Sequence, residues 1–441
     1  MVNDLKQLMR DNVAAPPPDR LDLDALVPAG RRRVRRRRTA LLGCTAALAA
    51  GAVVAVGIGG PGGSGRVAEA AHPPKPDAPT IRLADATQAV TGRDYEVLAS
   101  FTNQNLDRDN GQYFDGVTDD GLVLFRDGPR EAQPTPRFAL MDPATGAKDW
   151  LPDLDIGWAQ TWPVELGADR LVLAGVDSRS SRFVTYVFDR AGRQWTTMSW
   201  PGLPKAAEPF SFVPHDGRLY LRVPASVGQP PPGGWPTGPD GEADDADAEG
   251  DTYHLWSVSL TDSSDVRDEG MTVGDVAFTQ GSMVWTDRSG GDPGRVHVRS
   301  LATDEEHSFD PQEGEKCNVL SFGATGDRIV MSEYCGTYAD GVRDDRVQIL
   351  TTDGDQVVTL QDNGVDGALA GPGSSLVTMT AYQPKLGGTY VYDLAADRLL
   401  RVSEGFSRYG SGGGAPDGMF LYGTPVNHGK GQTTWLAKLL D

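Results

Sequence analysis

The residues best placed for covalent chemistry are two cysteines in the acidic C-terminal part of the chain, Cys317 and Cys335. Two cysteines this close in sequence are typical of a disulfide in an oxidising compartment, and two buried free thiols are the alternative. The bond would close a loop of about 17 residues, worth about 3 kcal/mol by the chain-entropy relation. The pair therefore predicts a disulfide and export of this part of the chain.

Other residues with catalytic or metal-binding chemistry show no spacing that predicts an active site. The histidines have no metal-binding spacing, and there is no G-x-S-x-G elbow or suitable Cys–His arrangement. Carboxylates are too numerous for a catalytic pair to be chosen. The sequence thus predicts neither a cofactor nor a clear metal site, and it leaves enzymatic activity undecided.

One acidic stretch, "DGEADDADAEGD" at 240–251, raises the question of calcium binding. Asp245, Asp247 and Glu249 imitate the start of a D-x-D-x-D-G loop. Trp256, however, stands where such a loop needs a bidentate glutamate. Prolines and glycines precede the stretch, so we expect a mobile, solvated loop, with these three carboxylates as a weak calcium candidate.

Charge divides the chain into a basic head and an acidic body. The formal net charge is −20, and residues 1–65 carry +5, so the remainder carries −25. An acidic body repels phosphate backbones, which argues against nucleic-acid binding. The basic charge is concentrated in seven arginines, which are Arg31, Arg32, Arg33, Arg35, Arg36, Arg37 and Arg38.

An uncharged segment, residues 39–58, follows these arginines directly. Its twenty residues match the length of a helix that crosses a hydrocarbon core of ~30 Å. The positive-inside rule then places residues 1–38 in the cytoplasm and the rest of the chain outside. We therefore expect a single-pass protein of the cell membrane, with the arginines determining its topology.

Two other interpretations of this head remain. The segment could be an export signal that is cleaved near Ala70, because "AEA" at 68–70 resembles a signal-peptidase site. Lipid attachment at Cys44 is the other, but only "TALLG" precedes that cysteine and the apolar run follows it.

An internal repeat dominates the remainder of the chain. A turn rich in Asp and Gly precedes a short apolar strand seven times, at steps in the forties apart from one longer step. Four short strands in each repeat of this length are typical of a β-propeller blade. The seven copies of the apolar strand are "DGLVLF" (120–125), "DRLVLA" (169–174), "GRLYLR" (217–222), "GSMVWT" (281–286), "DRIVMS" (327–332), "SSLVTM" (374–379) and "GMFLYG" (418–423).

The repeat predicts an all-β fold, a seven-bladed β-propeller. The apolar strands should be the second strand of each blade, buried on both faces. The last copy ends before its final strand, so "DYEVLASF" (94–101) should complete that blade and close the ring. The expected organisation is a cytoplasmic tail (1–38), a transmembrane helix (39–58), a Gly/Pro-rich linker (59–92) and the propeller (93–441) with an acidic insertion (226–251).

The blade assignment also places the candidate sites. Cys317 begins the first strand of the fifth blade and Cys335 ends its second, and these ends are adjacent in an antiparallel pair. A ligand site should lie at the mouth of the central channel, where connections enter the innermost strands. The residues near these points are Trp158, Gln160, Trp162, Asp275, Asn318 and Asp366.

Period and strand pattern over residues 93–441 resemble the WD-repeat, Tol-type and quinoprotein-type propellers. Asp142, Thr145, Gly146 and Trp150 match the quinoprotein repeat, whereas Leu140 replaces its alanine and the other blades lose Thr or Trp. The whole layout resembles single-pass surface proteins of high-GC Gram-positive bacteria. This second resemblance implies a location and a fold and no activity.

These observations favour a membrane-anchored extracytoplasmic propeller that binds or scaffolds a protein or a small ligand at the cell surface. The alternatives are an envelope hydrolase or lyase that uses channel carboxylates, and a sensor. In the sensor, residues 1–38 would dock a cytoplasmic regulator such as an alternative sigma factor.

Overall fold

The computed structural model describes most of the chain from residue 78 onwards. The described residues are 78–106, 112–128, 135–154, 156, 161–177, 182–205, 207, 211–239, 241–339, 341–370, 374–382, 385–404 and 415–440. The expected tail (1–38) and membrane segment (39–58) lie outside them. Within these ranges, no helix has the length and apolar character to cross a bilayer.

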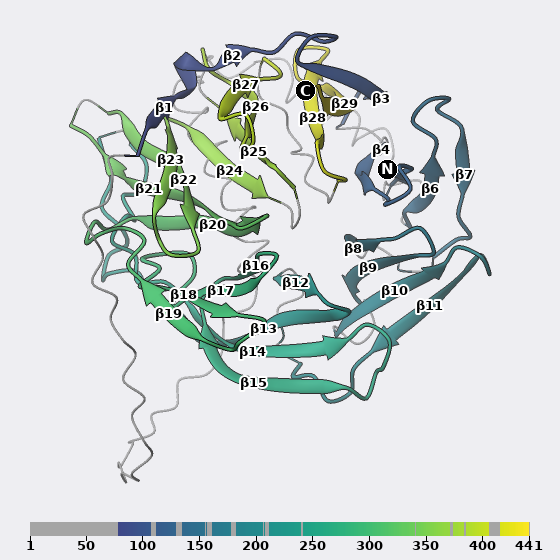
Figure 1. Ribbon diagram of the computed structural model, residues 1–441, viewed down its shortest axis with the longest axis horizontal. Coiled ribbons are helices and arrows are strands. Elements are labelled where there is room, and N and C mark those ends of the chain that lie inside the picture. Colours follow the sequence, from purple (N-terminus) through teal and green to yellow (C-terminus); the bar gives the residue numbers. More distant parts are fainter. Residues whose placement is uncertain are drawn as a thin grey trace, which may run out of the picture. The chain divides into compact units, whose positions relative to one another are not determined.

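The described residues fold into seven β-sheets arranged around a central axis (Figure 1), which confirms the seven-bladed propeller. We call the sheets blades one to seven in chain order, and four of them form the first half of the ring. Their strands are β4 (Gln112–Val117), β5 (Val123–Asp127), β6 (Arg137–Met141) and β7 (Lys148–Trp150); β8 (Thr161–Leu166), β9 (Arg170–Val176), β10 (Phe183–Asp189) and β11 (Gln194–Ser199); β12 (Phe212–His215), β13 (Arg218–Ser226), β14 (Thr252–Ser259) and β15 (Val266–Val273); and β16 (Val276–Phe278), β17 (Ser282–Thr286), β18 (Val296–Ser300) and β19 (Glu306–Phe309).

Blades five to seven complete the ring. The apolar repeats form the second strand of blades one to six, as predicted, and in blade seven the repeat forms β28, the first of the three strands that the structure describes there. The remaining strands are β20 (Asn318–Thr325), β21 (Arg328–Thr337), β22 (Arg343–Thr351) and β23 (Gln356–Gln361); β24 (Val365–Ala370), β25 (Leu376–Ala381), β26 (Gly388–Asp393) and β27 (Arg398–Arg401); and β28 (Met419–Val426) and β29 (Gly431–Leu439) with β3 (Tyr95–Asn103).

Blade seven joins strand β3, near the start of the described chain, to β29, the last described strand. Strand β3 pairs antiparallel with β29, from Tyr95 opposite Leu439 to Asn103 opposite Gln432. The strand predicted at 94–101 therefore completes the last blade, so the ring is closed by backbone hydrogen bonds.

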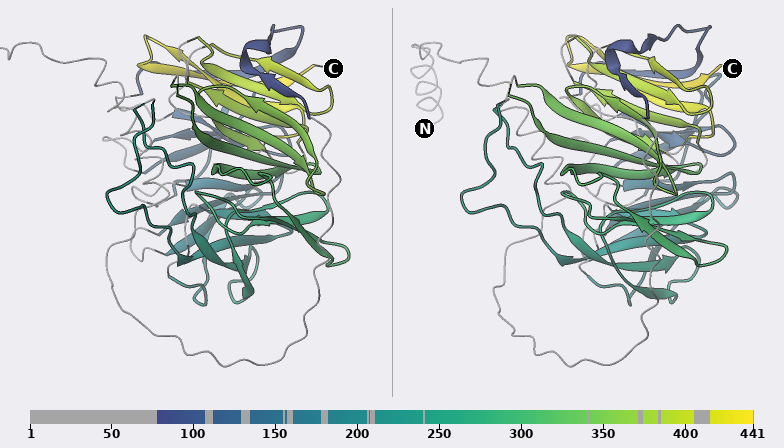
Figure 2. Two further views of the ribbon diagram at one scale, coloured as in Figure 1. Left: turned by 90° about the vertical axis from the view of Figure 1, so that its left-hand side faces the viewer. Right: turned by 60° about the vertical axis from the view of Figure 1, so that its left-hand side comes forward.

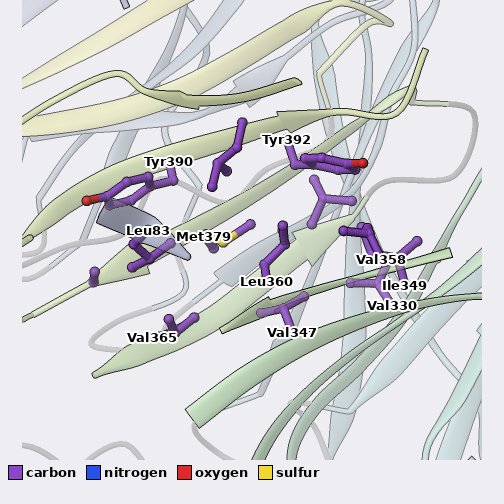
Figure 3. Packing of buried hydrophobic residues seen from close by; sticks show 13 residues of the cluster. Leu83, Val330, Val347, Ile349, Val358, Leu360, Val365, Met379, Tyr390 and Tyr392 are labelled. Atoms are coloured by element: carbon purple, nitrogen blue, oxygen red, sulfur yellow. The ribbon is translucent and has the colours of Figure 1, made fainter. Parts of the chain in front are cut away.

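The hydrophobic core lies between blades rather than within one centre. Seven clusters of buried apolar residues occur, and each joins side chains of two neighbouring blades. Figure 3 shows the cluster at the seam of blades five and six, where Val330 and Ile349 meet Met379 and Tyr392. Both faces of a central strand are thus apolar, which explains the continuous apolar runs in the sequence.

The last part of the expected linker differs from the prediction. Strands β1 (Thr80–Arg82) and β2 (Thr87–Gln88) pair in parallel with the outer strands β23 and β27. Between them a 3-10 turn, η1 (Leu83–Asp85), buries Leu83 to 2% exposure beside Tyr390 and Met379 (Figure 3). Unpaired sheet edges accept a further strand and the seam accepts an apolar side chain, so this segment is part of the propeller.

The ring has two faces with different loops. The turn face carries the short turns that join the first to the second strand and the third to the fourth strand of each blade. The opposite face, which we call the strap face, carries the connections between blades and the loops from the second to the third strand. The insertion after Ser226 and the expected channel residue Asp275 belong to connections of the strap face, whereas Trp162, Asn318 and Asp366 lie on the first strands of their blades.

The insertion is an ordered strap (residues 227–251), not the mobile loop expected from its prolines and glycines. It runs from β13 of blade three across the top of blade four to blade five. A Cβ at Gly228 would lie 1.7 Å from the carbonyl oxygen of Glu249, so the two ends of the strap touch backbone to backbone. Bridges from Glu249 to Asp292 and from Asp251 to Ser289 hold it on blade four.

Candidate functional site

A hollow of about 180 Å³ opens on the strap face between blades three and four. Its mouth is polar, with Ser211 before β12, Arg222 on β13 and Asp275 before β16. Most of its lining side chains are aliphatic or aromatic, and they reach the innermost strand of blade five. The apolar lining consists of Phe212, Val213, Tyr220, Leu255, Val276 and Phe322.

An ion pair between blades organises the mouth of this hollow. Arg222 Nη1 donates to Asp275 Oδ1 at 2.6 Å and to the carbonyl oxygen of Gly274 at 2.9 Å. Arg222 Nη2 donates to Ser211 Oγ at 2.6 Å, and the guanidinium lies over the ring of Tyr253. The arginine is therefore fixed from several directions, which makes it a rigid recognition element rather than a mobile charge.

Ser289 connects this pair to the strap. Its hydroxyl donates to Asp275 Oδ1 at 2.9 Å and lies 3.1 Å from Arg222 Nη1. Its backbone exchanges two hydrogen bonds with Asp251, the last residue of the strap. The seating of the strap and the geometry of the mouth consequently depend on the same residue.

Arg126 on blade one makes an ion pair that can be compared with that of Arg222. Arg126 on β5 donates to Asp115 Oδ2 at 2.6 Å and to the carbonyl oxygen of Thr161 in blade two at 2.6 Å. Asp115 is the extra residue of a β-bulge in β4, and burial raises the pKa of its carboxyl. Both side chains of this pair are less than a tenth exposed, and the Arg126 pair ties two blades together.

A second polar cluster lies on the strap face of blade five. Glu333, fully buried, accepts hydrogen bonds from Gln312, Gln348 and Arg346. Nearby, the buried Asp345 pairs with Arg343 and accepts from the backbone N–H of Gly364. Buried carboxylates are tolerated because each has a cation and further donors.

The strap ends its path on this cluster. Glu242 lies 3.5 Å from Arg343, and Tyr334 donates to Asp244 Oδ1 at 3.2 Å. Burial raises the pKa of Tyr334 to about 12, so its hydroxyl keeps its proton and remains a donor to the strap. Electrostatic contacts of blade five therefore anchor the acidic strap.

The structure joins Cys317 and Cys335 by a disulfide. Cys317 precedes β20, Cys335 lies in β21, and the neighbouring residues Asn318 and Tyr334 pair across the two strands. Arg346 lies 3.1 Å from Cys317 Sγ and also contacts Glu333. The disulfide thus borders the buried cluster that holds the strap.

The structure brings one of the six expected channel residues, Asp275, into the hollow. Trp162 lies half-buried on β8, and Asn318 is buried at the start of β20, where no described residue bonds to its Oδ1. Asp366 lies on β24, and Trp158 and Gln160 fall outside the described residues.

The calcium candidates do not converge in the part of the chain that the structure describes. Asp247 is exposed and pairs loosely with Lys316, at 3.6 Å. The carbonyl of Asp245 accepts from Ala248 within the strap, and Glu249 contributes its backbone to the contact with Gly228. Among the described residues, only Cys317, Glu333 and Cys335 are gathered closely enough to ligate a metal, and two of them form the disulfide.

Sequence reasoning missed Arg222, Ser211 and Ser289. One signal was available, because Arg222 ends the apolar run "GRLYLR" in a strand expected to be buried on both faces. A charge at such a position needs a partner. Its partner, Asp275, is 53 residues away, and the sequence does not show which carboxylate the arginine meets.

No protein-family model matches the sequence, and no curated protein matches it. Among solved structures, an oligogalacturonate lyase in complex with manganese shares 12% identity over 80% of this chain and 99% of its own, with a TM-score of 0.46. TolB from Acinetobacter baumannii shares 12% identity over 69% of this chain and 61% of its own, with a TM-score of 0.34. The propeller domain of the Trilobed protease from Pyrococcus furiosus shares 10% identity over 69% and 87%, with a TM-score of 0.42. At such identities no activity carries over to this chain.

Proposed function

We propose that this chain is a membrane-anchored binding module whose propeller receives a protein partner on its strap face. The observation that carries this proposal is the ordered strap, which contacts blades four and five and whose last residue, Asp251, bonds Ser289 next to the mouth of a hollow. A loop of this length that is held in place by bridges, a hydrogen bond to Tyr334 and an ion pair to Arg343 costs conformational entropy that a mere connection would not require. Its position beside the hollow makes it part of a built surface.

Exposed apolar side chains also support binding of a partner on the strap face. Val227 on the strap is 49% exposed, and Tyr338 and Val342, at the tip joining β21 to β22, are 56% and 40% exposed. Large apolar side chains that gather on one face are typical of interaction sites. Figure 2 shows this tip and the strap projecting on the same side of the ring.

The proposed location is the outer side of the membrane, with residues 39–58 as the anchor. Twenty uncharged residues behind seven arginines support it, and the disulfide between Cys317 and Cys335 agrees with an oxidising compartment. Protease added to intact protoplasts should remove a C-terminal epitope while a cytoplasmic marker survives. Protection of the epitope until the cells are lysed would contradict this orientation.

Binding on the strap face can be tested by photo-crosslinking in living cells. A benzophenone amino acid replaces Tyr338 or Val342 in the full chain, and Leu301 serves as the control. Leu301 is 43% exposed on the turn face, so its exposure is comparable. We expect one adduct of constant mass from both strap-face positions and none from Leu301. Equal adducts from both faces, or none from the strap face, would overturn the proposal.

A further inference from the structure

The hollow beside Arg222 has the size of one side chain rather than of a whole ligand. Its volume of about 180 Å³ would hold about six water molecules at ~30 Å³ each. Sites for small molecules occupy roughly 300–1,000 Å³ and enclose most of the ligand. A cavity of this size at a partner-binding face fits the pocket that receives a single anchoring residue of a protein partner.

We propose that this hollow receives one large apolar side chain from an extended, basic segment of the partner; this inference rests on the proposed function. The walls determine the nature of the side chain. Six of the nine lining residues are aliphatic or aromatic, and three of them, Phe212, Tyr220 and Phe322, offer rings. Burying a leucine or phenylalanine side chain there would contribute most of the local affinity.

The polar mouth matches the backbone of such a segment. The hydrogen bonds from Arg222 and Ser289 both end on Oδ1 of Asp275, and no described residue donates to Oδ2. Ser211 Oγ accepts from Arg222, and among the described residues nothing accepts its own hydroxyl hydrogen. One acceptor and one donor beside an apolar hollow suit the N–H and C=O of a peptide unit.

The negative charge of the strap indicates that the partner segment is basic. The strap carries seven carboxylates between residues 227 and 251 and no lysine or arginine. Asp251 at its end bonds Ser289, which in turn bonds Asp275 at the mouth. Lysine or arginine residues next to the apolar anchor would therefore meet negative charge, which speeds association and selects the partner.

Synthetic peptides test this proposal on the full chain in detergent. The probe is fluorescein-labelled Lys-Lys-Gly-Phe-Gly-Lys-Lys, compared with versions that carry Ala for Phe or Glu for every Lys. Anisotropy should show at least about tenfold tighter binding of the Phe peptide than of the Ala peptide, and loss of binding for the acidic peptide. Salt should weaken binding of the Phe peptide.

Two variants place a tryptophan at different parts of the lining, Ser211→Trp at the mouth and Phe322→Trp on β20. Each should remove the preference for Phe, and Ser211→Thr, which keeps the hydroxyl, should retain it. Intact disulfide and unchanged circular dichroism identify variants that remain folded. Equal binding of the Phe and Ala peptides, no binding of either, or a preference that survives both tryptophans would overturn the anchor hollow. The proposed function is tested separately by the crosslinks, and it stands if the strap-face adducts form while the preference for the Phe peptide is absent.

Discussion

The two faces of the propeller use charge in opposite ways. On the turn face, Arg193 pairs with Asp149 across blades one and two while both side chains are about half exposed. On the strap face, Glu333 and Asp345 are fully buried under or beside the strap, each with its own arginine. Exposed pairs contribute little to stability, whereas a buried pair is costly to break.

The two faces also differ in whether their contacts repeat from blade to blade. The turn face repeats a local solution, in which a polar side chain at the end of the third strand accepts the backbone N–H two residues later. Asp142, Asp189, Ser259, Ser300 and Asp393 all do so. The strap face is not periodic, because an insertion from one blade is held by another. The turns of the turn face are therefore similar from blade to blade, whereas the strap face has contacts that occur in particular blades and are not repeated around the ring.

The largest expected effect comes from removing one buried charge. Glu333→Ala leaves Gln312, Gln348 and Arg346 without their shared acceptor and should lower the free energy of unfolding by about 3–5 kcal/mol. Arg193→Ala on the turn face should cost far less, because water screens this exposed pair. Urea unfolding of both variants measures the contrast, and equal losses would show that the faces do not differ.

Removal of the disulfide by substitution should have the next largest effect on stability. Replacing Cys317 and Cys335 together by Ala removes a cross-link and should cost about 3 kcal/mol, because the unfolded chain gains freedom. Protease should then cut the strap of the folded variant sooner than the short turns. Urea unfolding and timed proteolysis are the measurements, and unchanged resistance of the strap would separate the disulfide from strap anchoring.

A matched pair of glycine substitutions tests the seating of the strap. Gly228→Ala places a Cβ 1.7 Å from the Glu249 carbonyl, whereas no atom lies within 4 Å of a Cβ at Gly281 on the turn face. We expect Gly228→Ala to cost about 1–3 kcal/mol or to release the strap, and Gly281→Ala to have little effect. Thermal unfolding and limited proteolysis distinguish these results, and equal behaviour of the two variants would disprove the close contact.

The smallest expected effect is a pH dependence on the turn face. Hydrogen bonds from Arg190 lower the pKa of Asp120 to about 2, below its ordinary value of 3.8. The pair between blades one and two therefore stabilises the fold above about pH 4 and loses this effect as the pH falls through 2. Because Asp120 is 40% exposed, the advantage over Asp120→Asn should be only about 0.5 kcal/mol. Acid titrations of stability for both proteins measure it, and a constant difference down to pH 2 would contradict the assignment.

The periodic part of the fold could be predicted from the sequence, and the contacts between repeats could not. Apolar triplets at a regular step identify the second strands of blades one to six and strand β28 of blade seven, and a truncated last repeat identifies the closing strand. Leu83 is missed because a short stretch of apolar residues interrupted by charges and following several prolines resembles a linker, and only the seam explains its burial.

The candidate site was predictable only where it depended on blade boundaries. Asp275 was identified because it precedes an innermost strand. Arg222 and Ser289 were not, because their roles depend on which side chains from different repeats face each other. The order of the strap is not predicted either, since the contact between Gly228 and Glu249 joins two backbone segments and leaves no local signal in the sequence.

The segment at 80–88 also determines how the ring bears mechanical load. Tension that enters through residue 78 reaches the three pairs of β1 with β23, then Leu83, and then the two pairs of β2 with β27. Only after these contacts yield does it reach β3, whose pairing with β29 closes the propeller. The two short outer strands should therefore detach first and protect the pairing of β3 with β29. A molecule that is pulled from this end should lengthen in small steps before the ring opens.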